Sequence, residues 1–215
     1  MPDKKFWINS YDDLKNPPHW AESFVPSKLA ERFVAALKER GLAENNILEI
    51  GCGNGRDSLF FAENGFNATC IDISANALVL AEKNKQDYLK ENKLSGQATF
   101  QEADAEALPF KDEEFDAVYS LSVLHATDLS KSLTQIYRVL KAGGVAWIHL
   151  LQKTIFLENN EIEVNCAPEK LQSLLNNSKF EILEFRSDVT NNKIDYDADK
   201  KNPHRHYAMI VKLKK

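Results

Sequence analysis

The sequence has few of the features that mark secreted, membrane or metal-binding proteins. Its 215 residues include only three cysteines, Cys52, Cys70 and Cys166, whose odd number and wide spacing match neither a disulfide framework nor a metal site. No apolar run approaches the length of a membrane span, and the N-terminus leads into no signal-type segment. We therefore expect a cytoplasmic protein without a membrane association. We also expect no metal, since His204 and His206 share a strand face but have no third ligand in view.

A basic excess is missing as well. The chain has 32 acidic residues against 27 lysines and arginines, a net charge of −5. Proteins that bind nucleic acid present a basic face, so we expect no nucleic-acid partner. The length and an apolar content of 43% fit one globular domain. The sequence carries no sign of the oligomeric state.

What the chain does have is a glycine-rich turn after an apolar, β-prone segment. Gly51, Gly53 and Gly55 follow residues 46–50 at every second position, and a helical pattern begins directly afterwards. This arrangement lets a ligand lie against bare backbone. A dinucleotide fingerprint would place its third glycine at position 56, which is Arg56 here, and no P-loop lysine is present. The turn therefore argues against both NAD and a nucleoside triphosphate.

A carboxylate at the end of the next predicted strand indicates what the ligand contains. Residues 67–72 form a second β-prone segment that ends at Asp72. The carboxylate should fall on the neighbouring strand tip, where it can accept hydrogen bonds from ribose hydroxyls. The turn and Asp72 together predict a ligand with a nucleoside.

Strand and helix patterns alternate along most of the chain. Strands are predicted at 46–50, 67–72, 97–101, 115–121 and 144–150, and helices at 28–40, 56–64, 75–92, 130–141 and 168–177. Ser27 and Ser74 can cap the helices at 28–40 and 75–92. Two late strands, 180–186 and 206–213, lack a crossover helix and should pair antiparallel. The pattern predicts an α/β fold, a Rossmann-like, doubly wound, mostly parallel seven-stranded sheet that ends in an antiparallel hairpin, with helices on both faces. Residues 1–26 read as aromatic and irregular, and 193–203 as a charged loop.

Five segments resemble the class I S-adenosylmethionine-dependent methyltransferases. They are Leu48 to Gly55, Asp72-Ile73, Asp104-Ala105 with Leu108-Pro109-Phe110, Phe115 to Ser120, and Leu140 to Gly144. They follow the family's order within residues 27–150. The resemblance implies an enzyme that uses S-adenosyl-L-methionine, in a single methyltransferase domain over residues 27–215. The run Gly55-Arg56-Asp57-Ser58 looks like the tellurite-resistance and thiopurine methyltransferase branch.

The resemblance implies cofactor-binding roles for residues at or near strand ends: Glu49, Gly51, Gly53, Asp72, Ile73, Asp104, Ala105 and Leu121. The two glycines let the methionine and ribose parts approach the main chain. Asp72 fits the ribose hydroxyls. The Asp104 carboxylate and the Ala105 N–H fit the adenine edge, Ile73 and Leu121 fit the two ring faces, and Glu49 supports the amino group of the methionine moiety. Asp104 could instead cap a helix, Asp72 could be a solvated carboxylate, and Glu49 could stabilise the turn.

The acceptor side is less defined. The segment Ser120-Leu121-Ser122-Val123 lacks the motif of the amino-group DNA methyltransferases, and the Pro-Cys nucleophile of the cytosine-C5 enzymes is also missing. Both absences favour a small-molecule methyl acceptor. His125, just beyond the predicted strand, is either a general base or a structural histidine.

The aromatic N-terminus forms the other part of the acceptor prediction. Trp7, Tyr11 and Trp20 have no place in the core alternation, so residues 1–26 are either a lid over the site or a cover for a sheet edge. Arg56 either steers an anionic group or lies exposed at the helix start.

Two other functions stay open: methylation of a protein side chain, and cofactor binding without turnover, in which the protein acts through a partner. The accepting atom is open too. Gly55 to Ser58 favours sulfur or a heavier chalcogen, whereas Leu108-Pro109-Phe110 and Leu140 to Gly144 favour carbon, oxygen or nitrogen of a metabolite.

Overall fold

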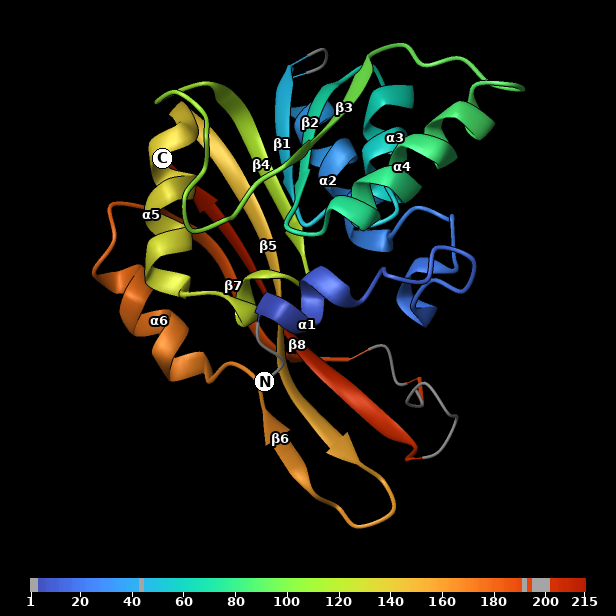
Figure 1. Cartoon of the computed structure of the whole chain (residues 1–215). Helices are drawn as coiled ribbons and strands as arrows, with labels where there is room; N and C mark the ends of the chain where they lie inside the picture. Colours follow the sequence, from blue (N-terminus) through green and yellow to red (C-terminus); the bar gives the residue numbers. More distant parts are fainter. Residues whose placement is uncertain (1–3, 43–44, 191–192, 195–201) are drawn as a thin grey trace.

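A mixed β-sheet forms the centre of the computed structural model, which describes residues 4–42, 45–190, 193–194 and 202–215 (Figure 1). Its order is β3-β2-β1-β4-β5-β8-β7, with β6 paired to β5. The parallel strands are β1 (Asn46–Ile50), β2 (Asn67–Asp72), β3 (Gln97–Glu102), β4 (Phe115–Leu121) and β5 (Leu140–Phe156). The antiparallel strands are β6 (Ile162–Val164), β7 (Glu181–Val189) and β8 (His204–Lys214). The predicted fold, including its terminal hairpin, is confirmed.

Helices cover both faces of this sheet. One face carries α2 (Lys28–Glu39), α3 (Arg56–Glu63) and α4 (Ala75–Tyr88), and the other carries α5 (Leu129–Val139) and α6 (Pro168–Asn176) (Figure 1). The predicted caps form, because the hydroxyl of Ser27 accepts from the Ala30 N–H and that of Ser74 from the Ala77 N–H. None of the described helices is long and apolar enough to cross a membrane.

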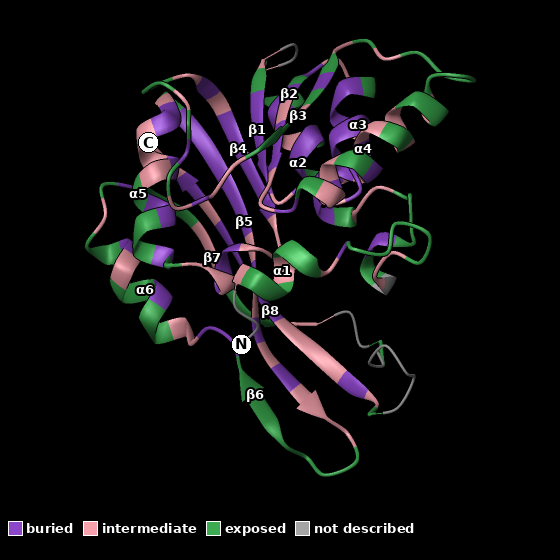
Figure 2. Ribbon diagram, viewed as in Figure 1, coloured by how far each residue is buried: buried purple, intermediate pink, exposed green. Residues whose placement is uncertain are grey.

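The core has two layers because alternate strand residues point to opposite faces. Ile47, Tyr119 and Trp147 pack with α2 and α3, whereas their neighbours Leu48 and Val118 pack with α5 and α6. Both layers are buried, as a parallel sheet requires (Figure 2). The described central strands β1, β4 and β5 therefore offer a ligand their ends and not their faces.

Three sequence predictions were wrong in detail. Residues in the N-terminal stretch predicted to be irregular include a short helix, α1 (Lys4–Asn9). The helix predicted at 75–92 ends at Tyr88. The strand predicted at 144–150 runs from Leu140 to Phe156, so Leu140 and Lys141 belong to β5 and not to the preceding helix.

Long-range pairing explains the length of β5. Its first residues join β4 across an irregular register that skips from Leu140 to Val145, with Gly143 at a φ of 78°. Its last residues are held by β8 and β6, which come later in the chain. The predicted charged loop at 193–203 lies mostly outside the described residues.

The connections of the sheet diverge between β1 and β4. From β1 the chain proceeds to β2 and β3 on one side, and then returns to β4 on the other. Open α/β sheets bind ligands at the carboxyl ends of the strands beside such a switch point. The tips of β1, β2, β4 and β5 are therefore where the site is expected.

Candidate active site

The glycine turn at the tip of β1 is closely covered. Gly51, Gly53 and Gly55 have φ values of 79°, 54° and 80°, a region that favours glycine. A Cβ atom at Gly51 would collide with the side chain of Val123, just after β4. A Cβ atom at Gly53 would lie 2.9 Å from the hydroxyl oxygen of Tyr11. The turn thus meets the β4 tip on one side and the N-terminal segment on the other.

Asp72 joins this turn to the tip of β2. Its two carboxylate oxygens accept from the backbone N–H of Gly53 at 2.9 Å and from that of Ser74 at 3.0 Å. Burial raises the pKa of Asp72, and these backbone hydrogen bonds oppose the rise. Each carboxylate oxygen retains a second lone pair, so hydroxyl donors can still be accepted. Ile73, the next residue, is half-buried.

Asp104 and Ala105 follow β3. The Asp104 carboxylate accepts from the Lys4 ammonium at 2.7 Å and from the Glu106 N–H at 2.9 Å. Burial favours the neutral acid, but Lys4 and the Glu106 amide outweigh it, so the pKa of Asp104 is lowered. Lys4 also lies 2.8 Å from the Glu106 carboxylate, and Ala105 is buried. The start of α1 is thereby tied to the β3 tip.

Glu49 lies beneath the first turn of α3. It is buried and accepts a hydrogen bond from the Ser58 hydroxyl. Burial, together with the charge of Asp57, raises the pKa of Glu49 to about 8. Glu49 therefore contacts α3 and not the open side of the glycine turn.

Asp57 is a buried anchor that sequence reasoning missed. Its carboxylate accepts from the N–H and the hydroxyl of Ser27, both at 2.7 Å, and from the Tyr119 hydroxyl at 3.0 Å. It thus ties the start of α3 to the N-cap of α2 and to β4. Arg56 is half-buried, with its Nε atom 3.7 Å from an Asp57 oxygen. Within the run Gly55 to Ser58, Asp57 and Ser58 therefore both make hydrogen bonds inside the protein that hold α3 in place.

The N-terminal segment, residues 4–26, is held across the carboxyl ends of the strands by several hydrogen bonds. The Ile8 carbonyl accepts from the Ser74 hydroxyl at 3.0 Å, and Asn54 donates to the Ala21 and Ser23 carbonyls at 2.8 and 3.1 Å. Figure 1 shows α1 in front of the sheet at this edge.

Aromatic packing adds to this cover. The rings of Trp7 and Trp20 meet edge to face at 5.8 Å, and Tyr11 packs with Ala77 and Leu80 of α4. Burial, with Asp72 nearby, raises the pKa of Tyr11. The indole Nε1 of Trp7 is buried and makes no hydrogen bond to the described residues. Its N–H group can therefore still donate to a ligand.

Two histidines lie on the acceptor side. His125 is buried, and its Nδ1 accepts from the Leu151 N–H at 3.4 Å. Nδ1 of His149 lies 2.9 Å from the hydroxyl oxygen of Ser122. Burial lowers the pKa of each histidine to about 4, aided in His125 by its neighbours His149 and His206. Both imidazoles are therefore neutral at pH 7.

Sequence reasoning selected His125 and overlooked His149, because residue 149 falls inside a predicted strand. The available signal was its place near the carboxyl end of that strand. In the sheet it pairs with Leu121, the half-buried last residue of β4. The tip of β4 thus lies beside the middle of β5 and brings Leu121, Ser122 and His149 together.

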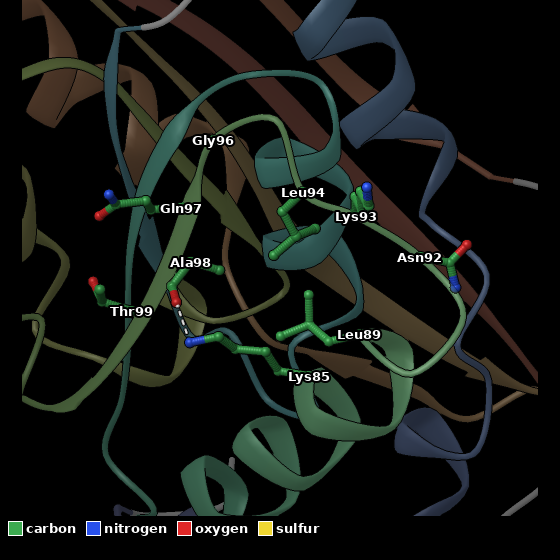
Figure 3. Close-up of a pocket in the computed structure, with 9 residues that line it drawn as sticks. All are labelled: Lys85, Leu89, Asn92, Lys93, Leu94, Gly96, Gln97, Ala98 and Thr99. Atoms are coloured by element: carbon green, nitrogen blue, oxygen red, sulfur yellow. Dashed lines mark hydrogen bonds between the residues drawn. The ribbon is translucent and has the colours of Figure 1, made fainter.

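A cavity of about 570 Å³ lies elsewhere, between the C-terminal end of α4 and the amino end of β3 (Figure 3). One of its charged lining side chains, Lys85, already donates to the Ala98 carbonyl at 2.8 Å. It faces the wrong end of the strands for a site at the switch point. Within the described residues, no group of three or more His, Cys, Asp or Glu side chains is arranged to hold a metal ion.

Comparison with known proteins decides the family. Residues 48–148 match the family described as a methyltransferase domain. An O-methyltransferase of Aspergillus nomiae is 31% identical over 169 residues, which cover 72% of this chain and 73% of that protein. The chain belongs to the class I S-adenosylmethionine-dependent methyltransferases. The narrower resemblance to the tellurite-resistance and thiopurine branch stays a prediction.

Other relatives support the same family and fold. The tocopherol O-methyltransferase of Arabidopsis thaliana is 35% identical over 108 residues, or 48% of this chain and 30% of that protein. The chain spans 30–60% of the length of several of the curated relatives it matches. A methyltransferase structure from Methanosarcina mazei has a TM-score of 0.65 at 24% identity, covering 83% of this chain and 96% of that one, and shows the same fold.

The residues of this methyltransferase fit its cofactor. The turn has three glycines in the left-handed region directly before the N-terminus of α3, and Asp72 offers lone pairs at the next strand tip. A buried, unpaired indole donor lies in the segment that covers them. A ligand whose hydroxyl groups donate to Asp72 and whose carboxylate accepts from N–H groups suits this arrangement.

Proposed function

We propose that this methyltransferase acts on a small molecule enclosed beneath its N-terminal segment. The observation that carries the proposal is the closed cover over the strand tips. Lys4 bonds Asp104, Ser74 bonds the Ile8 carbonyl, and Tyr11 lies over Gly53. Such a cover favours a compact acceptor over a folded protein or a duplex. Residues 1–26 then act as the lid of a domain formed by residues 27–215.

Each cofactor contact is part of the proposal. Asp72 accepts from the ribose hydroxyls while it keeps its bonds to Gly53 and Ser74. Asp104 and the Ala105 N–H meet the adenine edge, and Ile73 and Leu121 flank the ring. Glu49 acts indirectly, because it holds Ser58 and so fixes the first turn of α3. The N-terminus of α3 favours the carboxylate of the cofactor's methionine moiety.

The bound cofactor supplies a methyl group already activated on a positively charged sulfur. The chain's own residues then have to bind the acceptor, exclude water and align the accepting atom. The names of two relatives, an O-methyltransferase and a tocopherol O-methyltransferase, support a small acceptor.

The test combines binding and turnover. S-adenosylhomocysteine should bind the purified protein in a calorimetric titration, and NAD should not. Release of S-adenosylhomocysteine is then followed with panels of phenols, thiols, amines and carbon acids. Methylation of a peptide or protein alone would refute the small-molecule proposal. Cofactor binding without turnover of any panel would favour a protein that acts through a partner.

Removing the cover gives a second readout. A variant that lacks residues 1–26 should remain folded, because α2 begins at Lys28 with its own cap at Ser27. It should bind S-adenosylhomocysteine more weakly and lose the ability to discriminate against large acceptors. Full activity and unchanged selectivity would show that the segment only covers a sheet edge.

A further inference from the structure

The tip of β4, which borders the candidate site, contacts a residue that sequence reasoning overlooked, His149. β1 and β4 are neighbours whose connections leave in opposite directions, so their tips form the binding crevice. Val123 fills the space that the missing Cβ of Gly51 leaves open. The residue before it, Ser122, reaches His149 on β5. His149 is therefore linked to the crevice through Ser122 and Val123.

Ser122 adopts a backbone conformation that serine rarely adopts. Its φ is 58°, in the left-handed region that favours glycine. Its N–H donates to the His149 carbonyl at 2.9 Å, and its hydroxyl oxygen lies 2.9 Å from Nδ1 of the same residue. Strained residues persist where the surroundings hold them, and they cluster at functional sites. Here both holding contacts are made by His149.

The two neutral histidines differ in which nitrogen can take a proton. Nδ1 of His125 accepts from a backbone N–H, so its proton is on Nε2, which then has no lone pair. In His149, the Ser122 hydroxyl can accept from Nδ1–H, which leaves the lone pair on Nε2. Nε2 of His149 makes no hydrogen bond to the described residues and is not a buried unpaired atom among them. It can therefore meet an acceptor.

We propose that His149 takes the proton of a hydroxyl acceptor during methyl transfer, and that Ser122 is the positioning residue that fixes its tautomer. The inference rests on the proposed function and narrows the acceptor to small molecules with a phenolic or enolic hydroxyl. The acceptor's O–H bond breaks and its proton goes to Nε2. The oxygen's electron pair forms the bond to the methyl carbon, and the electron pair of the broken S–C bond stays on sulfur. The imidazolium then releases its proton to water.

Burial has two effects on His149. It lowers the pKa to about 4, so the lone pair is available throughout the neutral range, but it also makes His149 a weak base. The proton is therefore taken as the methyl group is transferred, when the acceptor oxygen becomes more acidic. A thiolate acceptor needs no base, because it is already deprotonated. Loss of His149 should therefore slow methyl transfer to a hydroxyl acceptor and have little effect on transfer to a thiolate.

The first test needs no substrate. In ¹⁵N-histidine spectra at pH 7, the His149 proton should be on Nδ1, with Nε2 unprotonated. The Ser122→Gly variant suits the left-handed backbone and removes the hydroxyl together with Cβ, so it should fold and shift His149 toward the other tautomer. The His149→Gln variant assigns the His149 signals by their loss, and the His206→Gln variant serves as a control. A proton on Nε2 in the wild-type protein would overturn the inference.

The second test compares acceptors. Catechol and phenol, which stay protonated at pH 7, are assayed beside benzenethiol, with S-adenosylmethionine as donor. The His149→Gln variant should lose about 10²–10⁴ in kcat with the phenols and only a few-fold with the thiol. The Ser122→Gly variant should lose less, in kcat and not in KM. Equal losses with phenols and thiol, or no loss with the phenols, would refute a proton-accepting role.

Failure of the proposed function gives a different result. If S-adenosylhomocysteine binds and no probe is methylated, the small-molecule function is refuted, while the tautomer still tests the Ser122–His149 geometry. If only thiols or amines are methylated, the protein is a small-molecule methyltransferase and the hydroxyl assignment is overturned.

Discussion

The buried carboxylate of Asp57 offers the sharpest test of how this fold is held together. Its side chain is about 2% exposed and accepts three hydrogen bonds, two from Ser27 and one from Tyr119. In the Asp57→Ala variant the Ser27 N–H and the Tyr119 hydroxyl both lose this partner. The Ser27 hydroxyl can still turn to the Tyr119 oxygen, 2.9 Å away. The loss is therefore only partly compensated.

The size of the effect follows from these contacts. A hydrogen bond to a charged group contributes about 1.5–3 kcal/mol, and removal of one partner from a buried charged network costs about 3–5 kcal/mol. We expect Asp57→Ala to lower the free energy of unfolding by about 3–5 kcal/mol. With a urea slope of about 2–3 kcal/mol/M, the unfolding midpoint should fall by about 1–2.5 M.

The assay is urea unfolding followed by circular dichroism. Asp87→Ala is the matched control, because Asp87 is exposed on α4 and pairs only with Lys90 at the surface, so no measurable change is expected. Tyr119→Phe removes a single hydroxyl and should cost less in the Asp57→Ala background than in the wild type. A loss below about 1 kcal/mol together with loss of methyl transfer would contradict the anchoring role and assign Asp57 to the chemistry.

Three further predictions concern the cofactor, pH and metals. Asp72→Ala should weaken binding of S-adenosylhomocysteine by about 10- to 100-fold in calorimetry, since it removes charge-assisted hydrogen bonds; an unchanged Kd would make Asp72 a solvated carboxylate with no part in binding. Glu49 has a pKa of about 8 when folded, above its unfolded value, so its burial costs stability increasingly as the pH rises from the unfolded pKa to about 8. Glu49→Gln should therefore flatten the loss of stability across that window, and an identical pH profile of unfolding would argue against the raised pKa. EDTA should leave methyl transfer intact, and activity restored only by added metal would revive His204 and His206 as ligands.

The predicted elements that proved accurate were those with strong local signals. The bounds of β1 and β2 were predicted correctly, because a short apolar run that ends in a turn leaves few alternatives. The caps at Ser27 and Ser74 were found for the same reason, since a hydroxyl next to a helix start bonds within three residues. The order of strands and helices then led to the doubly wound sheet.

The errors came where pairing over long distances decides the structure. β5 continues to Phe156 because β8, some fifty residues later, supplies its partners, which no window of sequence contains. α1 forms in a segment without a periodic pattern, and contacts with Asp104 and Ser74 at distant strand tips hold it in place. Tertiary contacts overrode the local preference in both cases.

For the site, the sequence by itself determined the cofactor and predicted the edge of the sheet where it binds. Glycine spacing and a strand-end carboxylate are local patterns with a direct chemical meaning. Only the tertiary structure decided what surrounds them. Asp57, read in the sequence as part of a branch motif, is an anchor because Ser27 and Tyr119 converge on it. His149 is a candidate base because β4 ends beside the middle of β5, where the pairing of Leu121 with His149 brings His149 to Ser122 across twenty-seven positions of sequence. The identity of a side chain is local, but its neighbours, and hence its charge and role, are set by the fold.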